Sequence, residues 1–266
     1  MSISIYNVDG KKKEKLKKPE IFNFPFHPVV IKKAFIHLNS LKFQPKGRDP
    51  EAGRKTTAES FGVGRGIARL PRIRGSPLSG RGAEVNMAVK GRKVHVTPPD
   101  KKIHKNLNKK EKKLALVSSI AATANKSLIE SRGHILGSLN DFPLIINNDI
   151  EKITKTKEFI DIAEKIGFNL DMSRAKKHKN RGGKSSWRGR SRKNKIGPLV
   201  VYKNNYGIKQ ACKNIPGVDV VNIDDLSLLH LAPGGVPGRL TIWSNNAIES
   251  LDKLLSKNLK VKYING

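Results

Sequence analysis

The sequence from Phe61 to Arg92 reads FGVGRGIARLPRIRGSPLSGRGAEVNMAVKGR. It contains six arginines and seven glycines, but only one lysine, Lys90, and one acid, Glu84. Guanidinium groups fork onto phosphate oxygens and stack on planar groups, which an ammonium group does not do. Glycines between them let the backbone approach a crowded surface closely. This composition indicates a segment that is threaded into folded RNA.

The stretch belongs to a longer basic segment that runs roughly from Gln44 to Lys113. The segment is too poor in large apolar residues to bury a core of its own. An irregular segment of this length inside a compact domain is usually functional or disordered. Its glycines and prolines oppose a helix, so we expect an extended or hairpin-like excursion.

Positive charge is concentrated in two parts of the chain. The formal net charge is +31, from 53 basic and 22 acidic residues. Residues 46–113 hold 19 basic and 6 acidic side chains, and residues 174–195 hold 11 basic side chains and no acid. Clustered cations indicate a polyanionic partner. A membrane surface is disfavoured because neither cluster has an apolar helical face, so nucleic acid is the expected partner.

Cysteine usage and hydropathy indicate an intracellular protein. Cys212 is the only cysteine, which excludes an intrachain disulfide and favours a reducing compartment. The start, MSISIYNVDGKKK, lacks the apolar run of a signal peptide. No stretch approaches the apolar length that a membrane helix needs. We therefore expect no membrane association.

Outside the basic segments, short apolar strands alternate with amphipathic helices. Expected strands are residues 3–5, 143–146, 198–202, 218–221 and 239–243. The first expected helix begins at Pro28, and further helices are expected over 108–128, 159–166, 207–214 and 224–231, with a short one after residue 169. A C-terminal helix is expected to open with a capping box of Asn246 and Glu249. The lysine-rich run from Lys11 to Lys18 is expected to be an exposed connection. This alternation predicts a layered α/β fold with a largely parallel sheet flanked by helices.

Signals for an enzyme are weak. Gly62-Val-Gly64-Arg-Gly66 begins like a dinucleotide fingerprint, but Ile67 stands where the last glycine is needed and no strand precedes it. Gly183-Lys184-Ser185 imitates the end of a phosphate loop, yet the required first glycine is absent. The histidines show no zinc-binding spacing, and Cys212 is expected to be buried. The sequence predicts no catalytic residue and no metal site.

The second basic tract, Arg174 to Lys195, adds an aromatic residue to the cations. Trp187 lies among them and could serve as a platform on which a base stacks. The alternative is that both basic tracts are solvated, disordered runs of charge. Ordering of such segments on a partner is compatible with that alternative.

Several motifs stand in order along the chain. The first is GRDPEAGRKTTAES, residues 47–60, which is followed by Gly64-Arg65-Gly66 and Leu70-Pro71-Arg72. Further motifs are residues 108–122, 132–134, 141–144, 231–235 and 238–243. Together they resemble the universal ribosomal protein L-four of the large subunit, in its archaeal and eukaryotic form. The modest length, without a long basic C-terminal extension, resembles the archaeal members.

The resemblance implies a domain organisation and a function. Residues 1–43 and 108–266 would form one α/β globular domain, and residues 44–107 a loop that penetrates large-subunit rRNA. The loop tip, near 64–75, would line the constriction of the nascent-peptide exit tunnel beside protein L-twenty-two. Tunnel-lining residues would be Arg69, Leu70, Arg72 and Arg74. Residues 174–195 would form a second rRNA-contacting segment.

The sequence and the resemblance together give a set of expected RNA contacts. They are Arg48, Arg54, Lys55, Arg65, Arg69, Arg72, Arg74, Arg81, Arg92, Lys93, Arg181, Lys184, Trp187, Arg188, Arg190, Arg192 and Lys193. The expected function is that of a structural constituent of the cytoplasmic large ribosomal subunit that aids its assembly. No cofactor is expected, and any magnesium would come with the rRNA. The alternatives are a free-standing RNA chaperone or other basic nucleic-acid-binding protein and, third, a nucleotide-dependent α/β enzyme.

Overall fold

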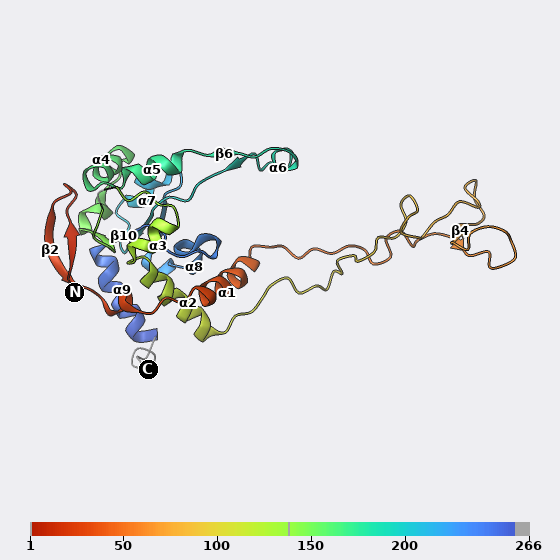
Figure 1. Ribbon diagram of the computed structural model, residues 1–266, viewed down its shortest axis with the longest axis horizontal. Helices are drawn as coiled ribbons and strands as arrows, with labels where there is room; N and C mark the ends of the chain where they lie inside the picture. The colour runs from red at the N-terminus through yellow and green to blue at the C-terminus, as the bar shows by residue number, and fades with distance from the viewer. Residues whose placement is uncertain (1, 138, 259–266) are drawn as a thin grey trace. The chain divides into compact units, whose positions relative to one another are not determined.

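The computed structural model describes residues 2–137 and 139–258, which fall into two compact units (Figure 1). Unit 1 comprises the described residues of Met1–Asn39 and Asn106–Gly266, and unit 2 comprises Ser40–Lys105. The loop predicted at 44–107 corresponds to unit 2, whose bounds lie slightly earlier at both ends.

Unit 1 is built on a six-stranded sheet of order β2-β1-β5-β10-β8-β9. The strands are β1 (Ser2–Tyr6), β2 (Lys12–Lys17), β5 (Leu144–Ile146), β8 (Leu199–Tyr202), β9 (Asp219–Asn222) and β10 (Thr241–Ser244). Neighbouring strands are parallel except β1 and β2, which are antiparallel. The predicted layered, largely parallel α/β fold is confirmed.

Both faces of this sheet are buried, because alternate residues of each central strand enter different apolar clusters. Leu144 and Ile146 pack into one cluster, whereas Ile145 between them packs into the other. Likewise, Ile242 packs into the first cluster and Trp243 into the second. Continuous apolar runs are typical of parallel strands with helices on both sides.

Helices supply the covering layers (Figure 1). The first cluster is closed by α3 (Lys126–Ser131), α4 (Thr156–Ile166), α5 (Asn169–Lys176) and α7 (Ile208–Lys213). The second is closed by the 3-10 helix η1 (Glu20–Asn23), α2 (Lys109–Ala122) and α9 (Asn245–Asn258). A smaller cluster joins α1 (Pro28–Ser40) to α2 and α8 (Leu228–Leu231). Each of these helices therefore buries apolar side chains against the sheet or against a neighbouring helix.

Three local predictions were wrong. Residues 12–17 form β2 rather than an exposed connection, since they pair with β1 and place Leu16 opposite Ile3. The periodic pattern of 108–128 is interrupted, because the Asn125 side chain accepts a hydrogen bond from the Ser127 amide and starts α3. Residues 224–231 also split, into the 3-10 helix η3 (Ile223–Asp225) and α8.

The capping box expected at Asn246 is also absent, because α9 begins one residue earlier, at Asn245. The residue before the helix is Ser244, and its Oγ accepts a hydrogen bond from the Ala247 amide at 3.2 Å. The cap is therefore Ser244. The same hydroxyl donates to the buried carboxylate of Glu151 at 2.7 Å.

Unit 2 has little regular structure. The strands β3 (Ala58–Glu59) and β4 (Arg72–Ile73) form a two-stranded antiparallel ladder, and turns make up most of the rest. An outgoing limb and a returning limb are joined by a backbone bond from the Arg48 amide to the Thr97 carbonyl at 3.1 Å. This arrangement is the hairpin-like excursion expected of a segment rich in glycine and arginine.

The second basic tract is a hairpin of unit 1 (Figure 1). Strands β6 (Lys179–Asn180) and β7 (Arg192–Lys193) pair antiparallel, and the short helix α6 (Lys184–Trp187) lies at the tip.

Among the described residues, no helix combines the length and the hydropathy needed to cross a membrane.

Candidate nucleic-acid interface

Phe61 organises two arginines at the tip of unit 2. The guanidinium carbons of Arg65 and Arg74 lie 5.6 and 5.2 Å from the centre of its ring. Arg74 also forms an ion pair with Glu59 at 3.0 Å. Cation–π contact fixes the direction of a guanidinium while leaving its N–H groups available to a phosphate. Phe61 is not among the predicted site residues, although an aromatic residue among arginines is a recognisable signal.

Arg72 is turned inward within unit 2. One of its terminal nitrogens donates to the Gly80 carbonyl at 2.7 Å, and its buried Nε has no hydrogen-bond partner. Backbone bonds between Ile73 and residues 80 and 81 close the same turn. Arg72 therefore stabilises this turn, in addition to any contact with RNA.

The other two expected tunnel-lining residues differ in exposure. Arg69 is exposed, and its carbonyl accepts a hydrogen bond from the Ser60 hydroxyl at 3.1 Å. Leu70 is half-buried and faces the backbone at Gly82. The structure therefore presents Arg69 to solvent more fully than Leu70 or Arg72.

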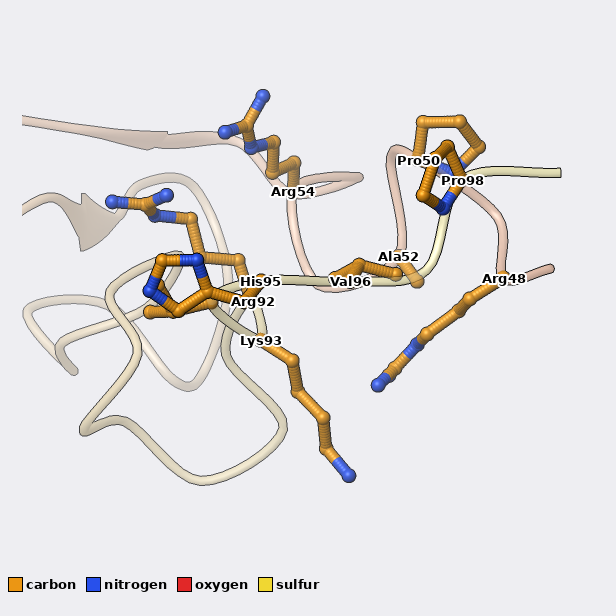
Figure 2. Close-up of a pocket in the computed structure, with 10 residues that line it drawn as sticks. Arg48, Pro50, Ala52, Arg54, Arg92, Lys93, His95, Val96 and Pro98 are labelled. Atoms are coloured by element: carbon orange, nitrogen blue, oxygen red, sulfur yellow. The ribbon is translucent and has the colours of Figure 1, made fainter. Parts of the chain in front are cut away.

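The two limbs of unit 2 cross near residues 47–54 and 91–98, where they enclose a small cavity (Figure 2). Its volume is about 260 Å³, and Arg48, Arg54, Arg92 and Lys93 line it together with His95, prolines, valines and an alanine. No carboxylate lines the cavity. Four of the expected RNA contacts are thus brought together from both limbs.

Lys55, also expected to contact RNA, is engaged by a neighbour. Its Nζ lies 2.8 Å from the Asp49 carboxylate, which also accepts a hydrogen bond from the Glu51 amide. The bonds from Lys55 and Glu51 hold the pKa of Asp49 below its ordinary value, and Asp49 raises the pKa of Lys55. The acid closest in sequence to Arg48 is therefore already bound to another cation.

The β6–β7 hairpin presents cations on both sides of one aromatic side chain. Trp187 is 88 % exposed. Its exposed companions are Arg181, Lys184, Arg188, Arg190, Arg192 and Lys193. Within the described part of the chain, none of these cations forms an ion pair. A nearly fully exposed indole among unpaired cations suits stacking on a base beside phosphates.

A buried polar cluster fixes the base of this hairpin. The Asp171 carboxylate accepts hydrogen bonds from His134 Nδ1 at 2.9 Å, from the Ile135 amide at 3.0 Å and from Arg174 Nε at 2.7 Å. Arg174 also donates to the Ile196 carbonyl, just beyond the hairpin, at 2.6 Å. Arg174 belongs to the basic tract of the sequence, but its side chain holds the hairpin to α5.

Two further arginines are internal to unit 1. Arg239 is 1 % exposed and donates to several carbonyls and to the Asp219 carboxylate at 2.6 Å. Arg132 donates to the Pro233 carbonyl at 2.8 Å, and burial together with the neighbouring Arg239 and Arg174 lowers its pKa to about 10. These two arginines therefore bind groups within unit 1 and do not add to the charge that a partner would meet.

The sequence features that imitate enzyme motifs lie in surroundings that do not suit those motifs. Cys212 is fully buried, as predicted, and burial raises the pKa of its thiol to about 12. No cluster of three or more metal-ligating side chains occurs within residues 2–137 and 139–258. Gly183-Lys184-Ser185 lies at the hairpin tip rather than between a core strand and a long helix.

Comparison with known proteins gives a consistent result. The family model described as "Ribosomal protein L4/L1 family" matches residues 17–254. The chain belongs to this family. Its relatives include the large ribosomal subunit protein uL4 of Methanosphaera stadtmanae, 44 % identical over 96 % of this chain and 98 % of that protein. The uL4 proteins of Sulfurisphaera tokodaii (43 %, 94 % of this chain and 93 % of that protein) and Saccharolobus islandicus (42 %, 96 % and 95 %) are similar.

Membership of the ribosomal protein L4/L1 family confirms the resemblance inferred from the motifs. The match to archaeal relatives nearly from end to end also agrees with the archaeal character expected from the length. The family is one of structural ribosomal proteins rather than enzymes.

Proposed function

We propose that this chain is a structural constituent of the cytoplasmic large ribosomal subunit and binds large-subunit rRNA. The observation that carries the proposal is the pair of exposed, cation-rich segments, unit 2 and the β6–β7 hairpin, attached to a fold whose apolar residues are used for its own core. Membership of the ribosomal protein L4/L1 family supports it. The names of the relatives assign those proteins to the large subunit.

The proposed rRNA contacts are the basic residues of both segments and Trp187. Arginines there would neutralise phosphates where RNA strands converge, so that counterions are released and repulsion between strands falls. In this way the chain would aid assembly of the subunit. It would need no cofactor of its own, and magnesium at the interface would belong to the rRNA.

Unit 2 would penetrate the rRNA, and its tip would line the constriction of the nascent-peptide exit tunnel. Arg69, Leu70, Arg72 and Arg74 are the proposed lining residues, next to protein L-twenty-two and the nascent peptide. The support is physical: the tip joins exposed arginine side chains to a turn that Arg72 stabilises from within. The tip can therefore form a narrow part of the tunnel wall although no apolar core supports it.

Sucrose-gradient sedimentation of a cell extract tests the proposal. The chain should sediment with the large subunit and remain there after a wash in moderate salt. A chain that stays at the top of the gradient, bound to assorted small RNAs, would instead support the alternative of a free-standing RNA chaperone or other nucleic-acid-binding protein.

A further inference from the structure

We propose that the crossing of the two limbs of unit 2 is a pincer that holds one RNA phosphodiester between cations of both limbs. The inference rests on the proposed RNA binding and deepens it by naming a site and the chemical group that the site takes. The outgoing limb contributes residues 47–54, and the returning limb contributes residues 91–99.

The cavity at the crossing has the size and lining of an anion site. Its volume of about 260 Å³ is below the range of about 300–1,000 Å³ of pockets for drug-sized ligands. Arg48, Arg54, Arg92 and Lys93 line it without any acid, and Asp49 is bound by Lys55 instead. Gathered like charges repel one another, so a bound anion stabilises this arrangement.

Each limb offers a cation to the same side of the crossing. In Figure 2 the side chains of Arg48 and Lys93 extend to one side, whereas those of Arg54 and Arg92 extend to another. A guanidinium forks onto two oxygens, and an ammonium adds a point charge. A phosphodiester has two non-bridging oxygens and can accept from both. Arg54 and Arg92 are then placed for a neighbouring phosphate of the same strand.

Glycines make the crossing closer than side chains would allow. A Cβ at Gly53 would lie 2.6 Å from the Arg92 backbone nitrogen, and a Cβ at Gly47 would lie 2.3 Å from the Pro99 Cα. Either methyl group would force the limbs apart. The lining of one cavity by Arg48 from one limb and Lys93 from the other thus depends on the close backbone approach at Gly47 and Gly53.

One pair of substitutions separates this geometry from net charge. Gly53 and Gly234 have nearly the same left-handed φ, +85° and +80°, but a Cβ at Gly234, which lies in unit 1 outside both basic segments, would meet nothing within 4 Å. Binding of the full chain to a short poly-uridine RNA is measured for Gly53→Ala and Gly234→Ala. Gly53→Ala should weaken binding about tenfold, the loss of one charge-assisted contact, and Gly234→Ala should leave it unchanged. Equal affinities of the two variants would overturn the pincer.

A second measurement asks whether Arg48 and Lys93 share a phosphate. The logarithm of affinity against the logarithm of salt concentration has a slope of about −0.7 per phosphate neutralised on a single strand. Because Lys93 still holds the shared phosphate, Arg48→Gln alone should leave the slope nearly unchanged, and so should Lys93→Gln alone. The double variant Arg48→Gln, Lys93→Gln should reduce the magnitude of the slope by about 0.7, because one phosphate is lost. Reductions of about 0.7 by each single variant and about 1.4 by the double variant would mean that the limbs bind separate phosphates.

The two proposals fail separately. Sedimentation places the chain in a ribosomal particle or outside it, whereas the glycine and charge variants report on the crossing in purified chain with a defined RNA. Absence from the particle together with weak binding by Gly53→Ala would leave the pincer standing and remove the ribosomal role. Presence in the particle with no effect of Gly53→Ala would support the ribosomal role and overturn the pincer.

Discussion

Asp171 shows how one residue links the core of unit 1 to its basic hairpin. The carboxylate is fully buried and satisfied by His134, Ile135 and Arg174. Asp171→Asn removes the charge and leaves the Arg174 guanidinium, 18 % exposed, without its ion pair. Breaking a buried pair in this way costs about 3 kcal/mol in the free energy of unfolding, which urea denaturation of the full chain measures.

A matched change at the surface provides the control. Asp149 pairs with Lys152 at 3.1 Å, but both side chains are more than half exposed. Asp149→Asn should change the free energy of unfolding by no more than about 0.5 kcal/mol. If the two variants lost the same stability, the cluster around Asp171 would have no special role.

The same cluster predicts the pH dependence of stability. Burial lowers the pKa of His134 below its ordinary 6.5, although Asp171 opposes the shift. Burial would raise the pKa of Asp171, but hydrogen bonds from His134 and Arg174 outweigh it and the pKa lies below 3.8. For both groups the unfolded chain binds more protons, so stability is complete above pH 6.5 and falls as pH falls.

His134→Gln isolates the first part of this dependence. Between pH 7.5 and 5 the unmodified chain should lose stability faster than the variant, since only the unmodified chain must keep a buried imidazole neutral. Urea denaturation at several pH values gives the two slopes. Parallel slopes would show that His134 does not titrate differently in the folded and unfolded chain.

At the scale of elements, apolar strands were predictable and charged ones were not. Residues 143–146 and 198–202 show continuous apolar runs, and both are strands of the sheet. The sequence KKEKLK of β2 has no such run, because an edge strand can carry lysines that discourage pairing with other chains. Its place follows from pairing with β1, a long-range fact that local sequence does not contain.

The candidate site was also predictable only in part. Composition indicated which segments are basic, but not that Arg174 is turned toward Asp171 or that Arg72 bonds to Gly80. Asp171 is only three residues from Arg174, but the sequence does not show that this pair is buried beside His134. The partner of Arg72 is a backbone carbonyl, which has no residue signature. The crossing of the limbs was likewise hidden, since Gly53 and Arg92 are close only in space.

The hairpin β6–β7 allows stacking and charge to be tested apart. Trp187→Ala should weaken binding to a short poly-uridine RNA about tenfold, within the usual range for loss of one base-stacking contact. The salt dependence should not change, because no phosphate contact is lost. Val29→Ala is the control, since Val29 is an apolar side chain that is 77 % exposed on α1, outside both proposed RNA-binding segments.

The two tryptophans also give an optical measurement of this contact. Trp243 is fully buried in the core, whereas Trp187 is 88 % exposed. Quenching of fluorescence by iodide should therefore report mainly on Trp187, and bound RNA should protect it. Unaltered quenching in the presence of saturating RNA would place the indole outside the interface.

At the scale of the whole molecule, charge and core occupy different parts of the chain. Residues 46–113 and 174–195 carry most of the net charge of +31, while the buried residues of the three apolar clusters all lie outside these two ranges. Net charge of this size opposes compaction unless a polyanion offsets it. Stability of the core and binding to RNA should therefore respond to different substitutions.

The double variant Arg72→Glu, Arg74→Glu tests that separation. Both residues lie in unit 2, so the midpoint and cooperativity of urea unfolding of unit 1 should not change. Incorporation into the large subunit should fall strongly, because two cations become anions where RNA phosphates converge.

Two controls accompany this variant. Arg69 is exposed and takes no part in the bond between Arg72 and Gly80, so Arg69→Glu checks that the loss is not due to that bond alone. Lys13→Glu, Lys15→Glu on β2 makes the same change in net charge outside the proposed interface. Equal incorporation of the two double variants, measured by sedimentation, would show that total charge rather than the tip of unit 2 governs binding.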